Sequence, residues 1–228
     1  MFRKLGTTLL MASFVLLAGR SAFADTVTYT LGAGNSAITP APYNPFYGTV
    51  LVNRTSTTTA TITFTADAGY LFLDSGVAAV NVNATSWTVS GLTGSNSISG
   101  FSGVDLTNSG SGQEDGFGNF NQTFTEFDGF NWSLQTLTFT LTDTSGTWAN
   151  AGSVLTGNND TNLVAAHVGI CNVDPCTFTG GSFANTGYAS ETGAINNPIP
   201  EPSSLALFGT GVIGMATMLR RRFQAPTA

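Results

Sequence analysis

Apolar and polar residues alternate with a period of two along the middle of this chain. Residues 61–65 read Thr-Ile-Thr-Phe-Thr, residues 86–90 read Ser-Trp-Thr-Val-Ser, and residues 137–141 read Leu-Thr-Phe-Thr-Leu. This alternation, with many β-branched residues, is typical of antiparallel strands that bury one face. The pattern predicts strands near residues 26–31, 49–54, 58–65, 70–73, 78–83, 86–91, 117–127, 130–142 and 164–171.

Many short strands without a convincing helical period predict an all-β domain. We expect an antiparallel two-sheet sandwich, jelly-roll-like, with an open meander or a β-solenoid as alternatives. Residues 90–116 are rich in Gly, Ser and Asn and are interpreted as a long loop with one weak strand. Asp128-Gly129 is a two-residue hairpin signal.

The alternation changes phase within one predicted strand. Trp132 and Leu134 fall on even numbers, whereas Leu137 and Phe139 fall on odd numbers. A β-bulge between Leu134 and Leu137 would keep both sets on the core face. Two strands with a sharp bend between sheets are the alternative.

The N-terminal 24 residues have a different pattern. Arg3 and Lys4 precede an apolar run at residues 5–19, and Ala22 and Ala24 form a small-x-small cleavage site. This order predicts a signal peptide at 1–24 and a mature chain that begins at Asp25. An uncleaved signal anchor is the alternative, and either segment would export the middle of the chain.

The C-terminal end is also distinct. After residues 198–202, Pro-Ile-Pro-Glu-Pro, there is no charge across residues 203–219, and Arg220, Arg221 and Arg222 follow. We expect residues 203–219 to form a transmembrane helix at the short end of the usual length. The arginines would act as a membrane stop on the cytoplasmic side. An amphipathic or core helix is the alternative.

In its order, spacing and position, this tail resembles the PEP-CTERM sorting signal. The resemblance implies recognition by exosortase through Pro200, Glu201 and Pro202, with cleavage near that motif. Residues 223–228 extend beyond the usual arginine cluster. Carriers of the signal are exported proteins of Gram-negative bacteria, often linked to exopolysaccharide and biofilm matrix. The implied route is export through the inner membrane, a membrane-anchored intermediate, and then the cell surface or the extracellular space.

The exported region is strongly acidic. Between residues 25 and 197 there are twelve acids against one base, Arg54, which gives a formal charge of −11. This charge disfavours nucleic acid as a partner but permits neutral polysaccharide or divalent cations. We expect residues 25–184 to form the β-sandwich domain, residues 185–197 a linker, and residues 198–228 the sorting signal.

Cys171 and Cys176 are the only cysteines. Because disulfides persist in exported proteins, we expect these two to be bonded to each other. A metal site is the rival interpretation, but the only histidine is His167, in an apolar, strand-like run where a hydrogen-bonded structural role is the simpler one.

No catalytic residues and no metal ligands emerge from the pattern. Glu114, Asp115, Glu126 and Asp128 supply carboxylates, but their spacing does not demand a glycosidase pair. No cofactor is expected; Ca²⁺ is the one ion worth naming, at those carboxylates or in the turn at residues 157–162.

The first functional hypothesis is a structural or adhesive protein of the cell surface or of an exopolysaccharide or biofilm matrix, not an enzyme. Its partners would be exosortase, the membrane transiently through the tail, and exopolysaccharide, with no nucleic acid. The alternative is a carbohydrate-binding module in which exposed Trp148, Tyr43 or Tyr47 stack on sugars, whereas Trp87 and Trp132 belong to the core. A secreted hydrolase is the third hypothesis.

Overall fold

The computed structural model describes residues 25–38, 46–73, 75–101, 105–126, 130–177 and 183–197. Several predictions fall outside these residues: the signal peptide with Ala22 and Ala24, the motif Pro200, Glu201 and Pro202, the span 203–219, and the cluster Arg220, Arg221 and Arg222. Residues Asp25–Pro198 form one compact unit. The described part contains no helix with the length and hydrophobicity that a bilayer crossing requires.

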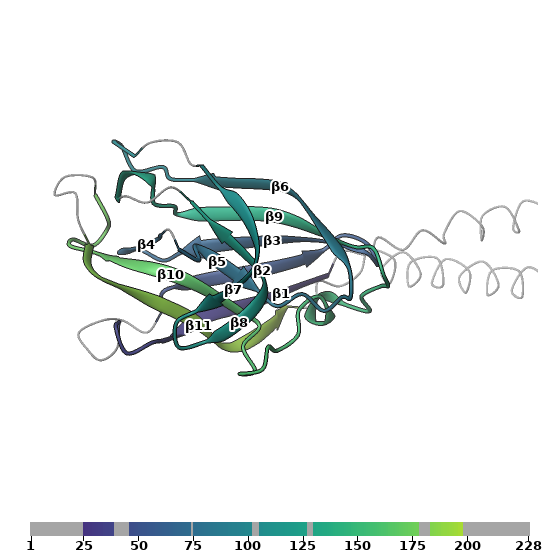
Figure 1. Cartoon of the computed structure of the whole chain (residues 1–228). Coiled ribbons are helices and arrows are strands. Elements are labelled where there is room, and N and C mark those ends of the chain that lie inside the picture. The colour runs from purple at the N-terminus through teal and green to yellow at the C-terminus, as the bar shows by residue number, and fades with distance from the viewer. Residues whose placement is uncertain are drawn as a thin grey trace, which may run out of the picture. The chain divides into compact units, whose positions relative to one another are not determined.

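The described domain consists of strands joined by turns and two short 3₁₀ segments (Figure 1). The strands are β1 (Asp25–Gly34), β2 (Gly48–Arg54), β3 (Thr59–Ala66), β4 (Tyr70–Phe72), β5 (Ala78–Val80), β6 (Trp87–Ser95), β7 (Thr107–Glu114), β8 (Gly118–Thr125), β9 (Thr136–Asp143), β10 (Val164–Cys171) and β11 (Phe183–Asn197). The 3₁₀ segments are η1 (Phe130–Trp132) and η2 (Ala151–Ser153). The predicted all-β antiparallel fold is confirmed.

The strands form one continuous sheet instead of the two separate sheets of the predicted sandwich. Their order is β6-β9-β3-β2-β1-β11-β10-β5-β8-β7, and β4 pairs with β10. The sheet curls until its two ends approach each other. The rings of Phe124 in β8 and Phe139 in β9 lie 4.3 Å apart, and Trp87 Nε1 in β6 donates a hydrogen bond to Gln122 Oε1 in β8 at 3.2 Å. The sheet is therefore nearly closed around one main core.

The predicted linker at residues 185–197 is wrong, and the domain does not end at residue 184. These residues belong to β11, which pairs with β1 on one side and with β10 on the other. Ala189 and Ser190 are fully buried, and Ser190 Oγ donates to the carbonyl of Val164 at 2.7 Å. The small and polar residues of this strand give no period of two in the sequence, so alternation could not predict it. Backbone ladders on both edges hold it in the sheet.

The predicted hairpin at Asp128-Gly129 is also wrong. Its two residues are outside the described part, but the flanking strands are not neighbours: β8 pairs with β5 and β7, whereas β9 pairs with β3 and β6. The chain crosses here from one end of the sheet to the other. Leu134 makes an isolated bridge with Phe72, and β9 begins only at Thr136. The change of phase is thus a break between segments and not a bulge.

The predicted loop at 90–116 is partly regular. β6 continues through Ser95, and β7 corresponds to the weak strand that the sequence predicts in this segment. β6 and β7 are the two end strands of the sheet. Their pairing is interrupted by register shifts between Ser90 and Thr93 and around Gly110.

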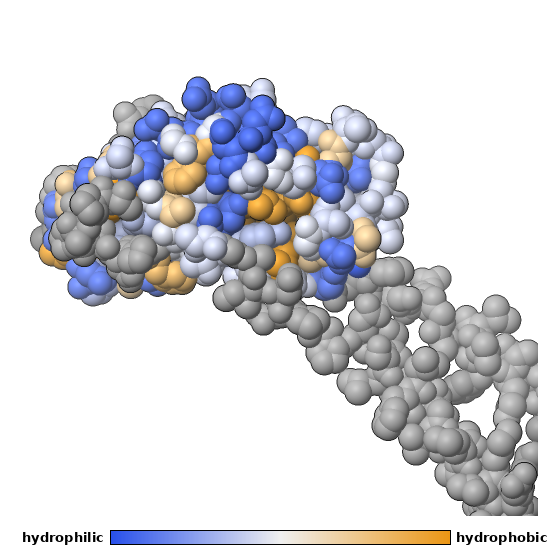
Figure 2. All heavy atoms as spheres, turned by 90° about the horizontal axis from the view of Figure 1, so that it is seen from below, coloured by the Kyte–Doolittle hydropathy of each residue, from blue (hydrophilic) through white to orange (hydrophobic). Residues whose placement is uncertain are grey.

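Alternation places the apolar residues of β1, β2, β3 and β9 in the core, apart from the outward-facing Leu51 in β2. In β3, Ile62 and Phe64 are fully buried, and in β9 Leu137, Phe139 and Leu141 are fully buried. The intervening positions face outwards. On the face of the domain seen in Figure 2, hydrophobic residues gather only in small groups between hydrophilic ones.

Candidate functional site

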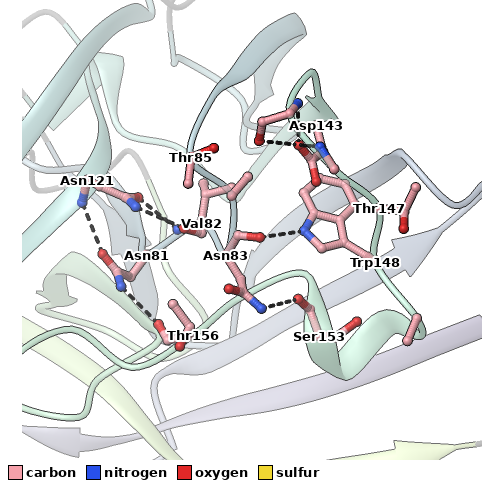
Figure 3. Close-up of a pocket in the computed structure, with 14 residues that line it drawn as sticks. Asn81, Val82, Asn83, Thr85, Asn121, Asp143, Thr147, Trp148, Ser153 and Thr156 are labelled. Carbon is pink, nitrogen blue, oxygen red and sulfur yellow. Dashed lines mark hydrogen bonds between the residues drawn. The ribbon is translucent and has the colours of Figure 1, made fainter.

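A groove of about 590 Å³ lies at one end of the domain. Three segments line it: residues 81–85, which follow β5; Asn121 in β8; and residues of the chain from Asp143 through η2 to Thr156. Figure 3 shows these segments meeting around asparagine and hydroxyl side chains. Because the segments are far apart in the sequence, only the fold brings them together.

Asparagine amides hold the walls of the groove. Asn81 Nδ2 donates to the carbonyl of Thr156 at 3.1 Å, and Asn83 Nδ2 donates to the carbonyl of Ser153 at 2.9 Å. Asn121 accepts from the N–H of Val82 at 2.7 Å and donates back to its carbonyl at 2.9 Å. These bonds satisfy backbone groups that no strand pairs, so the groove is a rigid, preformed surface.

Asp143 is the one carboxylate that lines this groove, and it is buried. Its Oδ1 accepts hydrogen bonds from the N–H groups of Ser145 and Gly146 at 2.8 and 2.9 Å, and from Ser145 Oγ at 2.9 Å. Burial by itself raises the pKa of Asp143, but these hydrogen bonds outweigh it and lower the pKa below its ordinary value. The carboxylate therefore stabilises the turn that follows β9, at residues 143–146.

The aromatic residues proposed for sugar stacking do not form an exposed platform. Trp148 is 2% exposed, and its Nε1 donates to the carbonyl of Asn83 at 2.9 Å. Tyr47 is 1% exposed and donates from its hydroxyl to the carbonyl of Ile38, while Tyr43 is outside the described residues. Alternation could not predict this result, because both side chains come from irregular segments that fold against the core.

The carboxylates considered for catalysis or calcium do not meet in this groove. Glu114 and Glu126 are buried, Asp115 accepts a hydrogen bond from Asn35 Nδ2 at 3.2 Å, and Asp128 is outside the described part. Within the described ranges no group of three or more His, Cys, Asp or Glu side chains is arranged to hold a metal ion. His167 stacks on Tyr188, with ring centroids 4.6 Å apart.

The turn at residues 157–162 uses its amide groups internally. Asn158 Oδ1 accepts from the N–H groups of Asp160 and Asn162, both at 3.0 Å. Asn158 and Asn162 both donate from Nδ2 to the carbonyl of Phe117, at 2.8 and 3.0 Å. The arrangement is an Asx turn that ties this loop to the start of β8.

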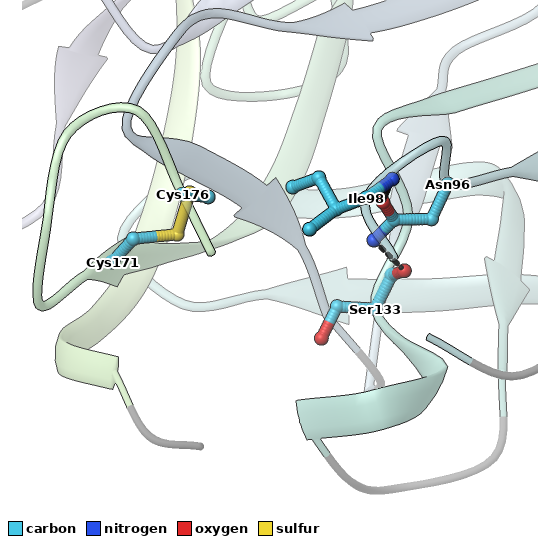
Figure 4. The surroundings of a disulfide bond; sticks show 5 residues. All are labelled: Asn96, Ile98, Ser133, Cys171 and Cys176. Carbon is cyan, nitrogen blue, oxygen red and sulfur yellow. Dashed lines mark hydrogen bonds between the residues drawn. A yellow bond between two sulfur atoms is a disulfide. The ribbon is translucent and has the colours of Figure 1, made fainter. Parts of the chain in front are cut away.

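Cys171 and Cys176 are joined by a disulfide, as predicted. The bond lies at the end of β10 and packs with Leu71 and the partly buried Ile98 (Figure 4). Asn96 Nδ2, which donates to the carbonyl of Ser133 at 2.8 Å, supports the loop that carries Ile98. A second hollow of about 320 Å³ lies beside this bond.

Residues 198–222 match the family model described as the PEP-CTERM protein-sorting motif. The chain carries a PEP-CTERM motif. This motif implies export, recognition by exosortase and sorting to the cell surface. Comparison with curated proteins and with solved structures gave no significant match. The motif covers only the tail, so the role of the exported domain has to be argued from its own surface.

Proposed function

We propose that this chain is a structural or adhesive protein of the cell surface or the extracellular matrix, with no catalytic role, that associates with exopolysaccharide. The PEP-CTERM motif supports the destination. After export, the predicted membrane span at residues 203–219 would hold the chain until exosortase cleaves near Glu201. The domain would then act outside the inner membrane.

The observation that carries this proposal is the chemistry of the groove around Asn83 and Asn121. Its lining consists of amides, hydroxyls, small apolar groups and the buried Trp148, together with the single carboxylate of Asp143. That carboxylate already accepts three hydrogen bonds from Ser145 and Gly146. General acid–base cleavage of a glycosidic bond would need a pair of carboxyl groups across the groove. Neutral hydrogen-bonding groups instead fit passive contact with uncharged, hydroxyl-rich material.

A carbohydrate-binding module is the second candidate, and the same groove favours it. Thr85, Thr147 and Thr156 are exposed and line the groove. Their hydroxyls can both donate to and accept from sugar hydroxyls. A carbohydrate-binding module would bind a short soluble oligosaccharide in the groove, whereas an adhesive domain would bind to the surface of a polymer.

The test is fractionation of the full-length chain in a host that has exosortase and makes an exopolysaccharide matrix. We expect the processed protein in the matrix fraction, retained after a wash at high salt, with no reducing ends released from the polysaccharide. Calorimetry of the secreted protein with soluble oligosaccharides then separates the candidates, because only a groove-binding module would give saturable heat. Protein that washes out with the medium would contradict the adhesive role, and released sugars would contradict the non-catalytic one.

A further inference from the structure

The outward side of one half of the sheet is almost entirely threonine. Along β3 the sequence Thr-Ala-Thr-Ile-Thr-Phe-Thr-Ala buries alanine, isoleucine and phenylalanine and turns every threonine outwards. β9 repeats this pattern with Thr-Leu-Thr-Phe-Thr-Leu-Thr-Asp. The outward positions of β1, β2, β3, β9 and β6, five adjacent strands, are called the threonine face below.

The strand register lines these threonines up across the sheet. Thr63 in β3 lies opposite Thr138 in β9, which lies opposite Thr93 in β6. Parallel rows contain Thr65, Thr136 and Ser95, and Asn53, Thr61, Thr140 and Ser90. Neighbours within a row are about 4.7–4.9 Å apart, and rows are about 6.4–6.8 Å apart along the strands. The face is thus a regular array of hydroxyl and methyl groups.

The array carries no charge in a region whose formal charge is −11. The outward positions of β2, β3 and β9 are threonines, apart from Asn53 and Leu51, which is 38% exposed. Thr138 donates to Thr63 Oγ1 at 3.2 Å, so neighbouring hydroxyls can bond to one another across the strands. Each hydroxyl keeps further donor or acceptor capacity towards a partner.

We propose that the threonine face is a docking surface for an uncharged, hydroxyl-rich polysaccharide chain. The absence of charge selects against polyanions, which the rest of the domain repels, and leaves neutral polymers as the complementary class. Threonine hydroxyls exchange hydrogen bonds with sugar hydroxyls, and their methyl groups contact the C–H faces of the rings. Many weak, repeated contacts favour a long polymer over a short oligosaccharide.

The twist of the sheet favours a flexible polymer chain over a flat, rigid partner. Adjacent strands rotate by about 20–25° about an axis along the rows, so the strand direction turns by roughly 60–75° across four strands. A planar crystal lattice cannot follow that turn, whereas a flexible chain can follow one row after another. This inference rests on the proposed adhesive function and assigns it a surface and a class of partner.

The experiment compares two matched triple variants of the full-length chain, each purified from the extracellular fraction of an exosortase-containing host. The face variant is Thr61→Val, Thr63→Val and Thr140→Val. The control variant is Thr107→Val, Thr177→Val and Thr186→Val, at three exposed threonines outside both the threonine face and the groove. Each variant removes three threonine hydroxyls and keeps the side-chain shape, and the face threonines are half-buried. The probes are cross-linked dextran and amorphous cellulose, with alginate as the charged comparison, and melting temperatures check that all the proteins fold.

We expect the wild-type and control-variant proteins to be retained on at least one neutral polymer and not on alginate, and the face variant to lose at least tenfold in retention. Retention of the face variant equal to that of wild type, or an equal loss in both variants, would overturn this inference and leave the adhesive function standing. Protein held in the matrix of its own cells but on neither neutral polymer would overturn it too. Adsorption of the protein to growing ice and to no polysaccharide would also overturn it, because the ligand of the threonine face would then be ordered water. Protein absent from the matrix fraction would refute the proposed function itself.

Discussion

Arg54 Nε donates a hydrogen bond to Asp25 Oδ1 at 2.7 Å, which pairs the only basic residue between positions 25 and 197 with the first residue of β1. Arg54 is 5% exposed. The other oxygen of Asp25 accepts from the N–H of Ala151 at 2.7 Å, and Arg54 Nη1 donates to the carbonyls of Ser56 and Trp148, both at 3.4 Å. The pair joins β1, β2 and η2 beside the predicted signal cleavage site.

Asp25→Ala should destabilise the domain, because it leaves the buried charge of Arg54 without its carboxylate. The side chain of Asp25 is 28% exposed and Arg54 keeps its bonds to Ser56 and Trp148, so we expect a loss of about 1–3 kcal/mol. Urea denaturation of the secreted protein measures the loss, with Asp160→Ala at an exposed acid as the matched control. Equal midpoints for the two variants would show that the pair contributes nothing.

Glu114 should make the domain less stable as pH rises. It is 1% exposed, its Oε2 has no hydrogen-bond partner, and burial raises the pKa to about 9 from an ordinary value of 4.5. Gly76 approaches so closely that any side chain there would collide with this carboxyl group.

The folded state therefore prefers the protonated form of Glu114, and that preference is fully effective below about pH 4.5. As pH rises from about 4.5 towards 9, this contribution of Glu114 to the free energy of unfolding decreases by up to about 1.4 kcal/mol per pH unit. Glu114→Gln should remove this slope and be more stable than wild type at pH 8. Asp160→Asn is the control, and parallel pH profiles for Glu114→Gln and wild type would contradict the prediction.

Removing the disulfide should loosen one end of β10 without unfolding the domain. Closing so short a loop contributes about 2 kcal/mol. Cys171→Ser with Cys176→Ser should lower the unfolding free energy by that amount, and the wild-type mass should increase by two hydrogens on reduction. Two alkylated thiols in the exported, unreduced protein would contradict the bond.

β11 should be essential for folding. A chain that ends after Ser182 loses the strand between β1 and β10 and exposes two backbone edges. A chain that ends after Asn197 keeps it. We expect the shorter chain to be unfolded or aggregated and the longer one to give a strand-type circular dichroism spectrum. Folding of the shorter chain would mean that residues 183–197 are dispensable.

Glu201→Ala should block processing of the tail in a host with exosortase. The motif at residues 198–222 predicts recognition there, so the variant should remain uncleaved and in the membrane fraction. Mass spectrometry and fractionation measure both effects. Ser203→Ala, next to the motif, is the control, and identical masses and fractions for the Glu201 variant and wild type would refute the prediction.

The local elements and the sorting of the chain follow from the sequence alone. Alternation in residues 61–65 and 137–141 predicted strands at 58–65 and 130–142, which overlap β3 and β9, because a strand that buries one face repeats every two residues. The order of residues in the tail identified the sorting motif, because such a signal is a continuous stretch of sequence that does not depend on the fold. The export signals, together with the presence of only two cysteines, were also enough to predict the bond between Cys171 and Cys176.

The connections between the strands, and the set of side chains that share a surface, arise only in the folded domain. β11 shows no hydrophobic alternation in the sequence, and its place in the sheet comes from backbone pairing with β1 and β10. The groove joins Asn81, Asn121 and Trp148, whose separation along the chain leaves no local signal. The threonine face depends on the strand register. Each strand shows its own alternation in the sequence. Thr63 aligns with Thr138 and Thr93 only because backbone hydrogen bonds fix the three strands side by side.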